Sequence, residues 1–234
     1  MYPLGENSLV MQLGLHINEE THRLVQALAA HLDRHPVPGM IEYVPAFTSV
    51  TVYYDLGHAA LEGEASGLSP YEVMSDYLFK AAAEAGERFD APSAVVEIPV
   101  CYGGDFGPDL DFVAEHNRLT PEEVIEIHSS GEYRTYMIGF APGFPYLGGL
   151  SDKIAAPRRE TPRLKIAAGT VGIAGLQTGV YPLESPGGWQ LIGRCPLPLF
   201  RPDQWPPTYI QMGNIVKFKA ITREQYERLR GAEE

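Results

Sequence analysis

Glycine and proline are so dense in two stretches of this chain that long helices cannot form there. The first stretch runs from Phe140 to Gly149 and the second from Gly169 to Trp189. Aromatic residues lie between the breaks, and sharply turning backbone that presents aromatic rings is typical of a surface shaped for a ligand or partner. A compact β-barrel with tight turns explains the individual glycines as well. The pattern thus predicts turn-rich β structure, and the charge distribution favours a binding site in it.

The charge of the chain is unevenly distributed. The net charge is −12, which argues against a nucleic-acid partner. Residues 141–219 nevertheless hold nine Lys or Arg and four Asp or Glu, whereas the remainder holds nine basic and 26 acidic residues. A basic, glycine-rich segment in an acidic chain predicts a small anionic ligand, such as a carboxylate or phosphate. Chance clustering of solvated arginines is the alternative.

The remaining composition is that of an ordinary globular protein. The chain has 234 residues, 44% of them hydrophobic, which is enough for one or two domains. No apolar run approaches the ~18 residues of a transmembrane helix, and no secretory signal is visible at the N-terminus. Cys101 and Cys195 are far apart in the sequence and do not have the close spacing of a metal-binding or redox motif. We expect a cytoplasmic protein without a membrane anchor, a metal site or a disulfide scaffold.

The first hundred residues predict a β-α-β-β-α-β order, which is that of a ferredoxin-like α+β sandwich with a four-stranded antiparallel sheet. Asn18 is expected to cap the first helix, and the capping box Ser69–Glu72 is expected to open the second. The expected strands are 9–15, 40–44, 49–54 and 94–101, although 98–101 could belong to the next domain. We place the boundary between domains 1–92 and 93–234.

From residue 133 onward, short β-rich runs joined by Gly/Pro turns predict a closed or nearly closed β-barrel. Two short helices are expected before it, near 108–130, and a third after Thr222. Residues 148–164 are expected to form a long ordered loop. Asp105, Asp109 and Asp111 are interpreted as the start of a helix rather than as metal ligands.

Standard catalytic motifs are absent, because the chain has no phosphate-binding loop, dinucleotide fingerprint, nucleophile elbow or zinc-protease helix. Candidate acid–base residues are His116, His128 and Glu184. Each histidine is expected near a helix C-terminus, where capping is the alternative to catalysis. Glu184 could act as a base or pair with an arginine.

The remaining candidates would bind an anion and shape its pocket. Guanidinium groups are natural clamps for carboxylate and phosphate, and neutral hydrogen-bonding groups lie beside them in the sequence. The expected anion-binding residues are Arg158, Arg163, Gln177, Tyr181 and Arg194, with Arg159 and Lys165 alongside. Phe144, Tyr146 and Trp189 are expected to line an apolar pocket or fill the barrel, and Phe140 is expected to fill the barrel core.

Four segments together resemble one known family: 99–110, 139–149, 177–182 and 185–194. They are similar to the B-subunit family of the ATP-hydrolysing 5-oxoprolinase, also called allophanate hydrolase subunit 1 or the KipI sporulation-kinase inhibitor family. The resemblance covers about residues 9–220, and Leu176, where glycine is expected, is a small departure. It implies a ferredoxin-like domain followed by a cyclophilin-like β-barrel.

The resemblance also implies an activity shared among subunits. The family opens the 5-oxoproline lactam to L-glutamate at the expense of ATP with Mg²⁺, and subunits A and C are the expected partners. An isolated family member is expected to be inactive, and whether ATP binds on it is left open. The alternatives are inhibition of a sensor histidine kinase, and a carboxyltransferase-type role in a urea carboxylase or allophanate hydrolase system.

Overall fold

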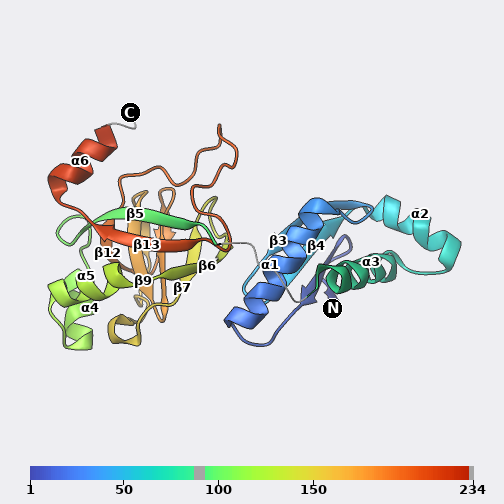
Figure 1. Cartoon of the computed structure of the whole chain (residues 1–234), viewed down its shortest axis with the longest axis horizontal. Coiled ribbons are helices and arrows are strands. Elements are labelled where there is room, and N and C mark those ends of the chain that lie inside the picture. Colours follow the sequence, from blue (N-terminus) through green and yellow to red (C-terminus); the bar gives the residue numbers. More distant parts are fainter. Residues whose placement is uncertain (87–92, 232–234) are drawn as a thin grey trace. The chain divides into compact units, whose positions relative to one another are not determined.

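The computed structural model describes residues 1–86 and 93–231. It divides the chain into two compact units, Met1–Pro92 and Ser93–Glu234, which are coloured from blue to green and from green to red in Figure 1. Within the described ranges, no helix combines the length and the apolar character needed to cross a membrane.

The first unit is a four-stranded antiparallel sheet with helices packed against it. The strand order is β1-β2-β4-β3, with α1 and α3 in contact with each other and with the sheet. Apolar side chains of β2 and β4 meet those of the helices in a core built around Leu9, Val52, Leu28 and Leu78. The elements are β1 (Tyr2–Pro3), β2 (Ser8–Gln12), α1 (Glu19–Arg34), β3 (Met40–Pro45), β4 (Ser49–Tyr54), α2 (Leu56–Ser66) and α3 (Pro70–Ala85).

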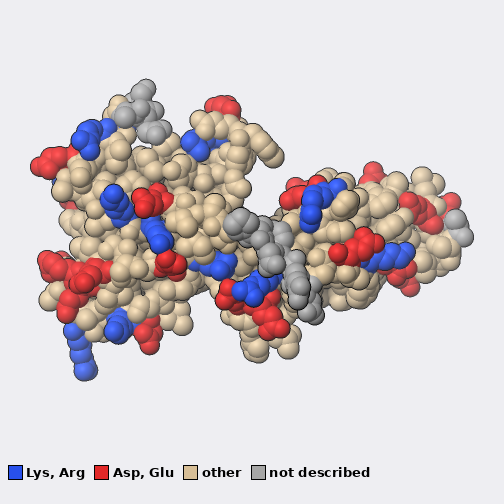
Figure 2. Space-filling model, viewed as in Figure 1, with Lys and Arg blue, Asp and Glu red and all other residues tan. Residues whose placement is uncertain are grey.

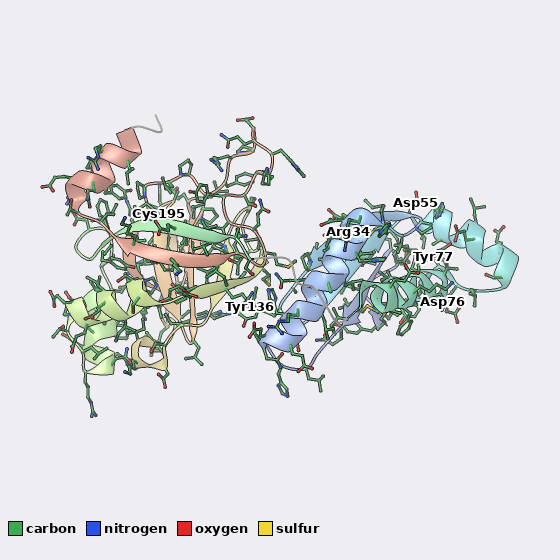
Figure 3. All side chains as sticks on the ribbon, in the orientation of Figure 1. Arg34, Asp55, Asp76, Tyr77, Tyr136 and Cys195 are labelled. Atoms are coloured by element: carbon green, nitrogen blue, oxygen red, sulfur yellow. The ribbon has the colours of Figure 1, made fainter. Side chains whose placement is uncertain are left out.

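The predicted helix caps of this unit are confirmed. The side chain of Asn18 accepts a hydrogen bond from the Thr21 amide, and Ser69 and Glu72 form a reciprocal capping box before α3. Helix α2 is not predicted by the sequence pattern, because two glycines in a short segment lower its helix propensity. Asp55, labelled in Figure 3, caps it by accepting from the His58 amide.

The expected fourth strand does not belong to this sheet, so the β-α-β-β-α-β prediction is wrong in its last element. Strand β5 (Val95–Tyr102) instead runs parallel to β13 (Ile215–Ala220) and antiparallel to β12 (Gln190–Arg194) in the second unit. The place beside β2 is taken by β1, through the pairs Tyr2↔Val10 and Pro3↔Leu9. Pairing with β13 along six residues satisfies backbone groups of β5 that a sheet edge would leave exposed.

The second unit contains a closed barrel of seven strands, as the turn-rich pattern predicts, in the order β10-β7-β6-β13-β5-β12-β9. A separate pair, β8 with β11, lies outside this ring. Ile98, Val171, Ile192 and Val216 are fully buried inside the barrel. The strands not yet placed are β6 (Tyr133–Ile138), β7 (Pro145–Gly148), β8 (Arg163–Ile166), β9 (Thr170–Ala174), β10 (Gln177–Val180) and β11 (Ser185–Gly187).

Helices cover parts of the barrel. Helix α4 (Leu110–Asn117) contacts β12, and α5 (Pro121–Ser130) contacts β13 and opens with the predicted Thr120–Glu123 capping box. A short 3-10 turn, η1 (Asp152–Ile154), interrupts the region expected to be one long loop. Helix α6 (Arg223–Gly231) ends the described chain and contacts β5. These elements leave the connections around 139–144, 155–163 and 181–189 to shape the barrel surface.

Candidate functional site

An aromatic cavity of about 340 Å³ opens between the two glycine- and proline-rich stretches. Phe144 is the central member of the ring cluster that lines this cavity. Its ring contacts those of Tyr146, Tyr181 and Trp189 edge-on at centroid distances of 4.9, 5.2 and 5.5 Å. Edge-to-face contacts of this kind hold aromatic rings in fixed orientations. The lining residues are Phe140, Phe144, Tyr146, Arg158, Arg159, Pro162, Tyr181, Pro186, Gly187, Gly188 and Trp189.

Two glycines explain why the aromatic rings can pack so closely. A Cβ atom on Gly179 would lie 2.9 Å from the Pro145 carbonyl oxygen and 3.0 Å from the Phe144 ring. A Cβ atom on Gly187 would collide with the Tyr181 hydroxyl. Both positions therefore require glycine because of close approach, which is a reason for their place in the sequence.

Phe140 does not fill the barrel core, contrary to the sequence-based expectation. Its side chain is 65% exposed, its φ is +67°, and its ring packs edge-on against Phe144 at 5.6 Å. Non-glycine residues rarely adopt positive φ. The turn at Gly139–Gly143 reverses the chain between β6 and β7, and this turn places Phe140 at the rim of the cavity rather than under it.

Tyr181 supplies a protonated hydroxyl to the aromatic cavity. Burial raises the pKa of Tyr181 to about 12, although a hydrogen bond with the Trp189 backbone and the charges of Arg158 and Arg163 lower it. Burial likewise raises the pKa of Tyr146, against the effect of Arg158. Both phenols are therefore hydrogen-bond donors at neutral pH.

Arg158 and Arg159 form a shared wall between the aromatic cavity and a neighbouring one. This second space, the Asp109 cavity, has a volume of about 530 Å³. Gln190 holds the wall in place by donating to the Pro157 carbonyl at 2.9 Å, while the Arg159 amide donates to the Gly188 carbonyl at 2.8 Å. The lining residues of the Asp109 cavity are Asp109, Phe112, Pro157, Arg158, Arg159, Glu160, Thr161 and Gln190.

Arg163 is engaged by a buried carboxylate instead of standing free as a clamp. Its two terminal nitrogens donate to the two oxygens of Asp109 at 2.9 and 2.8 Å, and Arg159 approaches the same carboxylate at 3.4 Å. The Leu191 amide donates to Asp109 at 2.7 Å. No ion pair of Arg158 occurs among the described residues, so its guanidinium is the one in this group that is left for a ligand.

The acid–base candidates do not meet in the cavity. His128 lies inside the barrel, where Nδ1 bonds with the Tyr102 hydroxyl at 2.7 Å and Nε2 with the Thr178 hydroxyl at 2.9 Å. Burial lowers the pKa of His128 to about 3, so the ring is neutral. His116 is exposed and stacks on Phe112, next to the Asp109 cavity but outside its lining. Glu184 is exposed and pairs with Lys165 at 3.0 Å.

The remaining predicted site residues lie elsewhere. Gln177 opens β10 at the β9–β10 turn, and it contributes to neither of these two cavities. Arg194, in β12, lines a third cavity together with residues of helix α6. The structure therefore brings together Arg158, Tyr181 and the aromatic residues. Within 1–86 and 93–231, no three His, Cys, Asp or Glu side chains are grouped so that they could hold a metal ion.

One face of the molecule shows how its charged side chains are distributed. On the face of the molecule shown in Figure 2, acidic and basic side chains are interspersed rather than gathered into one broad basic patch. An extended basic surface is what a polyanion such as nucleic acid requires.

Comparison with known proteins places the chain in a family. A family profile described as "Carboxyltransferase domain, subdomain C and D" matches residues 1–210. The B subunit of the Bacillus subtilis (strain 168) 5-oxoprolinase is 52% identical over 223 residues, covering 95% of this chain and 93% of that protein. The chain belongs to the 5-oxoprolinase B-subunit family. Another member, from Escherichia coli O157:H7, is 40% identical and covers 93% of this chain and 94% of its own length.

A solved structure is similar in fold to this member of the 5-oxoprolinase B-subunit family. TTHA0988 superposes with a TM-score of 0.78 at 34% identity, covering 92% of this chain but 40% of the TTHA0988 chain. The matched region is thus less than half of a longer polypeptide.

Two residues that hold the candidate site in place are not among the site residues expected from the sequence. Asp109 is interpreted from the sequence as a helix start, and it does precede α4, but its carboxylate binds Arg163 and the Leu191 amide. Gln190 is not among the sequence-based candidates, and it fixes the loop that carries Arg158. A signal for Asp109 is present, since it lies in the first segment of the family resemblance, 99–110.

Proposed function

We propose that this chain is one subunit of an ATP-dependent 5-oxoprolinase, which opens the lactam of 5-oxoproline to give L-glutamate. The observation that carries the proposal is the 52% identity to the B subunit of the Bacillus subtilis 5-oxoprolinase over 95% of the chain. Similarity along almost the entire length covers both units and the aromatic cavity, rather than one shared motif.

The chemistry of the aromatic cavity supports a small, ring-shaped anion as substrate. 5-Oxoproline combines a five-membered lactam with a carboxylate, and its ring can lie against the faces and edges of Phe144, Tyr146 and Trp189. The Arg158 guanidinium would bind the carboxylate, because charge-assisted pairs of this kind are both strong and directional. The protonated Tyr181 hydroxyl would donate to the lactam oxygen.

In this proposal the residues of the chain bind and orient the substrate. The lactam is resonance-stabilised, so its carbonyl carbon must be made electrophilic before water can attack it. A donor held rigidly beside the lactam oxygen favours the charge that develops there during the reaction. The hydroxyl of Tyr181 is held by the packed rings and by the Trp189 backbone, and the pocket therefore needs little reorganisation.

The residues of this chain fit an organic anion better than they fit ATP with Mg²⁺. Asp109 already engages Arg163 and Arg159, and the described residues offer no cluster of carboxylates or histidines for a divalent cation. A nucleotide triphosphate needs several cationic or backbone donors in one place. We assign the nucleotide to another subunit, and no step on this chain is derived through it.

A partner chain is part of the proposal. The region that matches this chain makes up 40% of TTHA0988, so the same module occurs elsewhere joined to additional polypeptide. We propose that subunits A and C of the 5-oxoprolinase provide the missing walls and groups here. The isolated chain is accordingly inactive.

The test is glutamate release from 5-oxoproline, measured with this chain alone, with the two partner subunits alone, and with all three. The proposal expects ATP-dependent glutamate only when all three are present. Full activity of the two partner subunits without this chain would contradict it, as would the lack of activity in a complex that forms all its subunit contacts.

A further inference from the structure

A third cavity in the barrel unit, the Arg194 cavity, is not used by the proposed function. Its volume is about 460 Å³, and it lies between the turn 167–169, the segment 194–198 and helix α6. It shares no lining residue with the aromatic cavity. The two cavities are therefore distinct spaces.

The Arg194 cavity is electropositive. Arg194 and Arg230 are the charged residues in its described lining, and no carboxylate side chain contributes to that lining. The Arg194 guanidinium lies over the Phe106 ring at 5.2 Å, and its Nε is buried without a hydrogen-bond partner. The Phe106 ring holds the guanidinium beside the cavity, where its positive charge favours an anion.

The uncharged residues of the lining add no negative charge and give the cavity an apolar side. Cys195, labelled in Figure 3, is buried, and burial raises the pKa of its thiol to about 12, so it adds no negative charge. Burial raises the pKa of the Tyr226 phenol, Arg194 and Arg230 lower it, and Cys195 and Glu227 raise it further, so the hydroxyl stays protonated. Leu183, Leu197 and Phe200 give the cavity an apolar side.

We propose that the Arg194 cavity binds a small organic oxyanion, namely a carboxylate or phosphate carried on an apolar body. The anionic group would pair with the Arg194 guanidinium and accept a hydrogen bond from the Tyr226 hydroxyl, with Arg230 supplying a second positive charge. The apolar body would contact Leu183, Leu197 and Phe200. This site goes beyond the proposed function and would stand without it.

The experiment is an NMR titration of the full-length, ¹⁵N-labelled chain, followed at the Arg194 Nε–H signal and at the amides of Gly169 and Leu197. The probes are inorganic phosphate and 3-methylbutanoate, titrated separately at constant ionic strength. Saturable shifts of these signals are expected for at least one probe. Saturation by phosphate alone would assign the site to phosphate groups, and tighter binding of 3-methylbutanoate would assign it to carboxylates with an apolar body.

Two variants make the titration specific. Arg194→Gln should weaken the binding seen at Gly169 and Leu197 by about tenfold or more, because a charge-assisted hydrogen bond is lost. Arg158→Gln, which removes a guanidinium from the aromatic cavity, should leave these shifts unchanged. Shifts that stay linear with concentration for both probes, or that both variants reduce equally, would overturn the proposal.

Discussion

His128 illustrates how a residue that attracts attention in the sequence can serve the core instead. Both ring nitrogens are bonded inside the barrel, the ring stacks on Phe218 at 4.5 Å, and its backbone carbonyl accepts from the Tyr133 hydroxyl. The sequence shows a histidine near a helix C-terminus, but it does not show which way the ring points. A neutral, fully satisfied imidazole of this kind stabilises one packing arrangement.

The buried neutral state of His128 predicts a loss of stability in mild acid. The unfolded residue binds a proton near pH 6.5, whereas the folded residue resists protonation until about pH 3. The contribution is therefore complete above pH 6.5 and is lost as the pH falls toward 3. Between pH 7.5 and 5.0 the loss should be about 2 kcal/mol, at roughly 1.4 kcal/mol per pH unit below 6.5.

Urea unfolding at the two pH values measures this effect. The pH-dependent loss should shrink in His128→Gln and persist in His116→Gln, which changes an exposed ring. If His128→Gln does not fold, the imidazole NMR shifts of the unmodified chain serve instead, since His128 should show no titration above pH 4.5. A His128 ring that titrates near pH 6.5 would contradict the assignment.

Phe140 carries a second prediction for a single residue. It is exposed, adopts positive φ and lines the aromatic cavity. Phe140→Gly relieves the unfavourable backbone conformation but adds freedom to the unfolded chain, so the free energy of unfolding should change by less than about 1 kcal/mol. The KM for 5-oxoproline in the three-subunit complex should rise, because one wall of the cavity is lost.

Leu176→Gly is the matched control for Phe140→Gly. Leu176 is also an exposed apolar residue in a turn, and it lies outside the lining of the aromatic cavity. Its replacement should leave the KM unchanged. A loss of stability in Phe140→Gly with no change in KM would show that Phe140 has a structural role only.

At the scale of elements, the Asp109 carboxylate ties three parts of the barrel unit together. It lies at the start of α4. It accepts hydrogen bonds from the Arg163 guanidinium of β8 and from the Leu191 amide of β12. This arrangement fixes one end of the segment whose Arg158 faces the aromatic cavity. Asp109 thus acts on the site as a positioning residue.

A double-mutant cycle tests the link between Asp109 and Arg163. Asp109→Asn and Arg163→Gln should each lower the free energy of unfolding, and the coupling between them should be about 1–3 kcal/mol. The same cycle with Lys165→Gln in place of Arg163→Gln provides the control, because Lys165 pairs with exposed Glu184. Purely additive effects of Asp109→Asn and Arg163→Gln would mean that the bidentate contact contributes nothing.

The elements that could be predicted from the sequence are those with local signals. Capping residues at Asn18, Ser69 and Thr120 mark helix starts, and Gly/Pro spacing indicates a barrel. The location of β5 could not be predicted, because its apolar pattern suits either sheet and its partner β13 lies more than a hundred residues later. Strand pairing across such separations leaves no local trace.

The candidate site was predictable in its aromatic part and less so in its charges. Phe144, Tyr146 and Trp189 meet as expected, because tight turns bring the two stretches together. The sequence does not distinguish an arginine that is free for a ligand from one already paired. Asp109 lies 54 positions before Arg163 in the sequence. Only the fold therefore shows that Arg163 pairs with Asp109 while Arg158 is available to a ligand.

At the scale of the whole molecule, the proposed function locates the substrate on the barrel unit and the nucleotide on another subunit. The basic segment 141–219 belongs to the barrel unit, whereas most of the acidic residues lie outside that segment. An anionic substrate is favoured near the former by simple electrostatics. The central claim is that Arg158 in the aromatic cavity binds the carboxylate of this substrate.

The most direct measurement of that claim is the KM for 5-oxoproline in the reconstituted three-subunit complex containing Arg158→Gln. Lys80→Gln, which removes the same charge from an exposed position in α3, is the control. We predict a KM about tenfold or more above the unmodified value for Arg158→Gln, with unchanged complex formation, and no change for Lys80→Gln. Equal KM values for the two variants would contradict the claim.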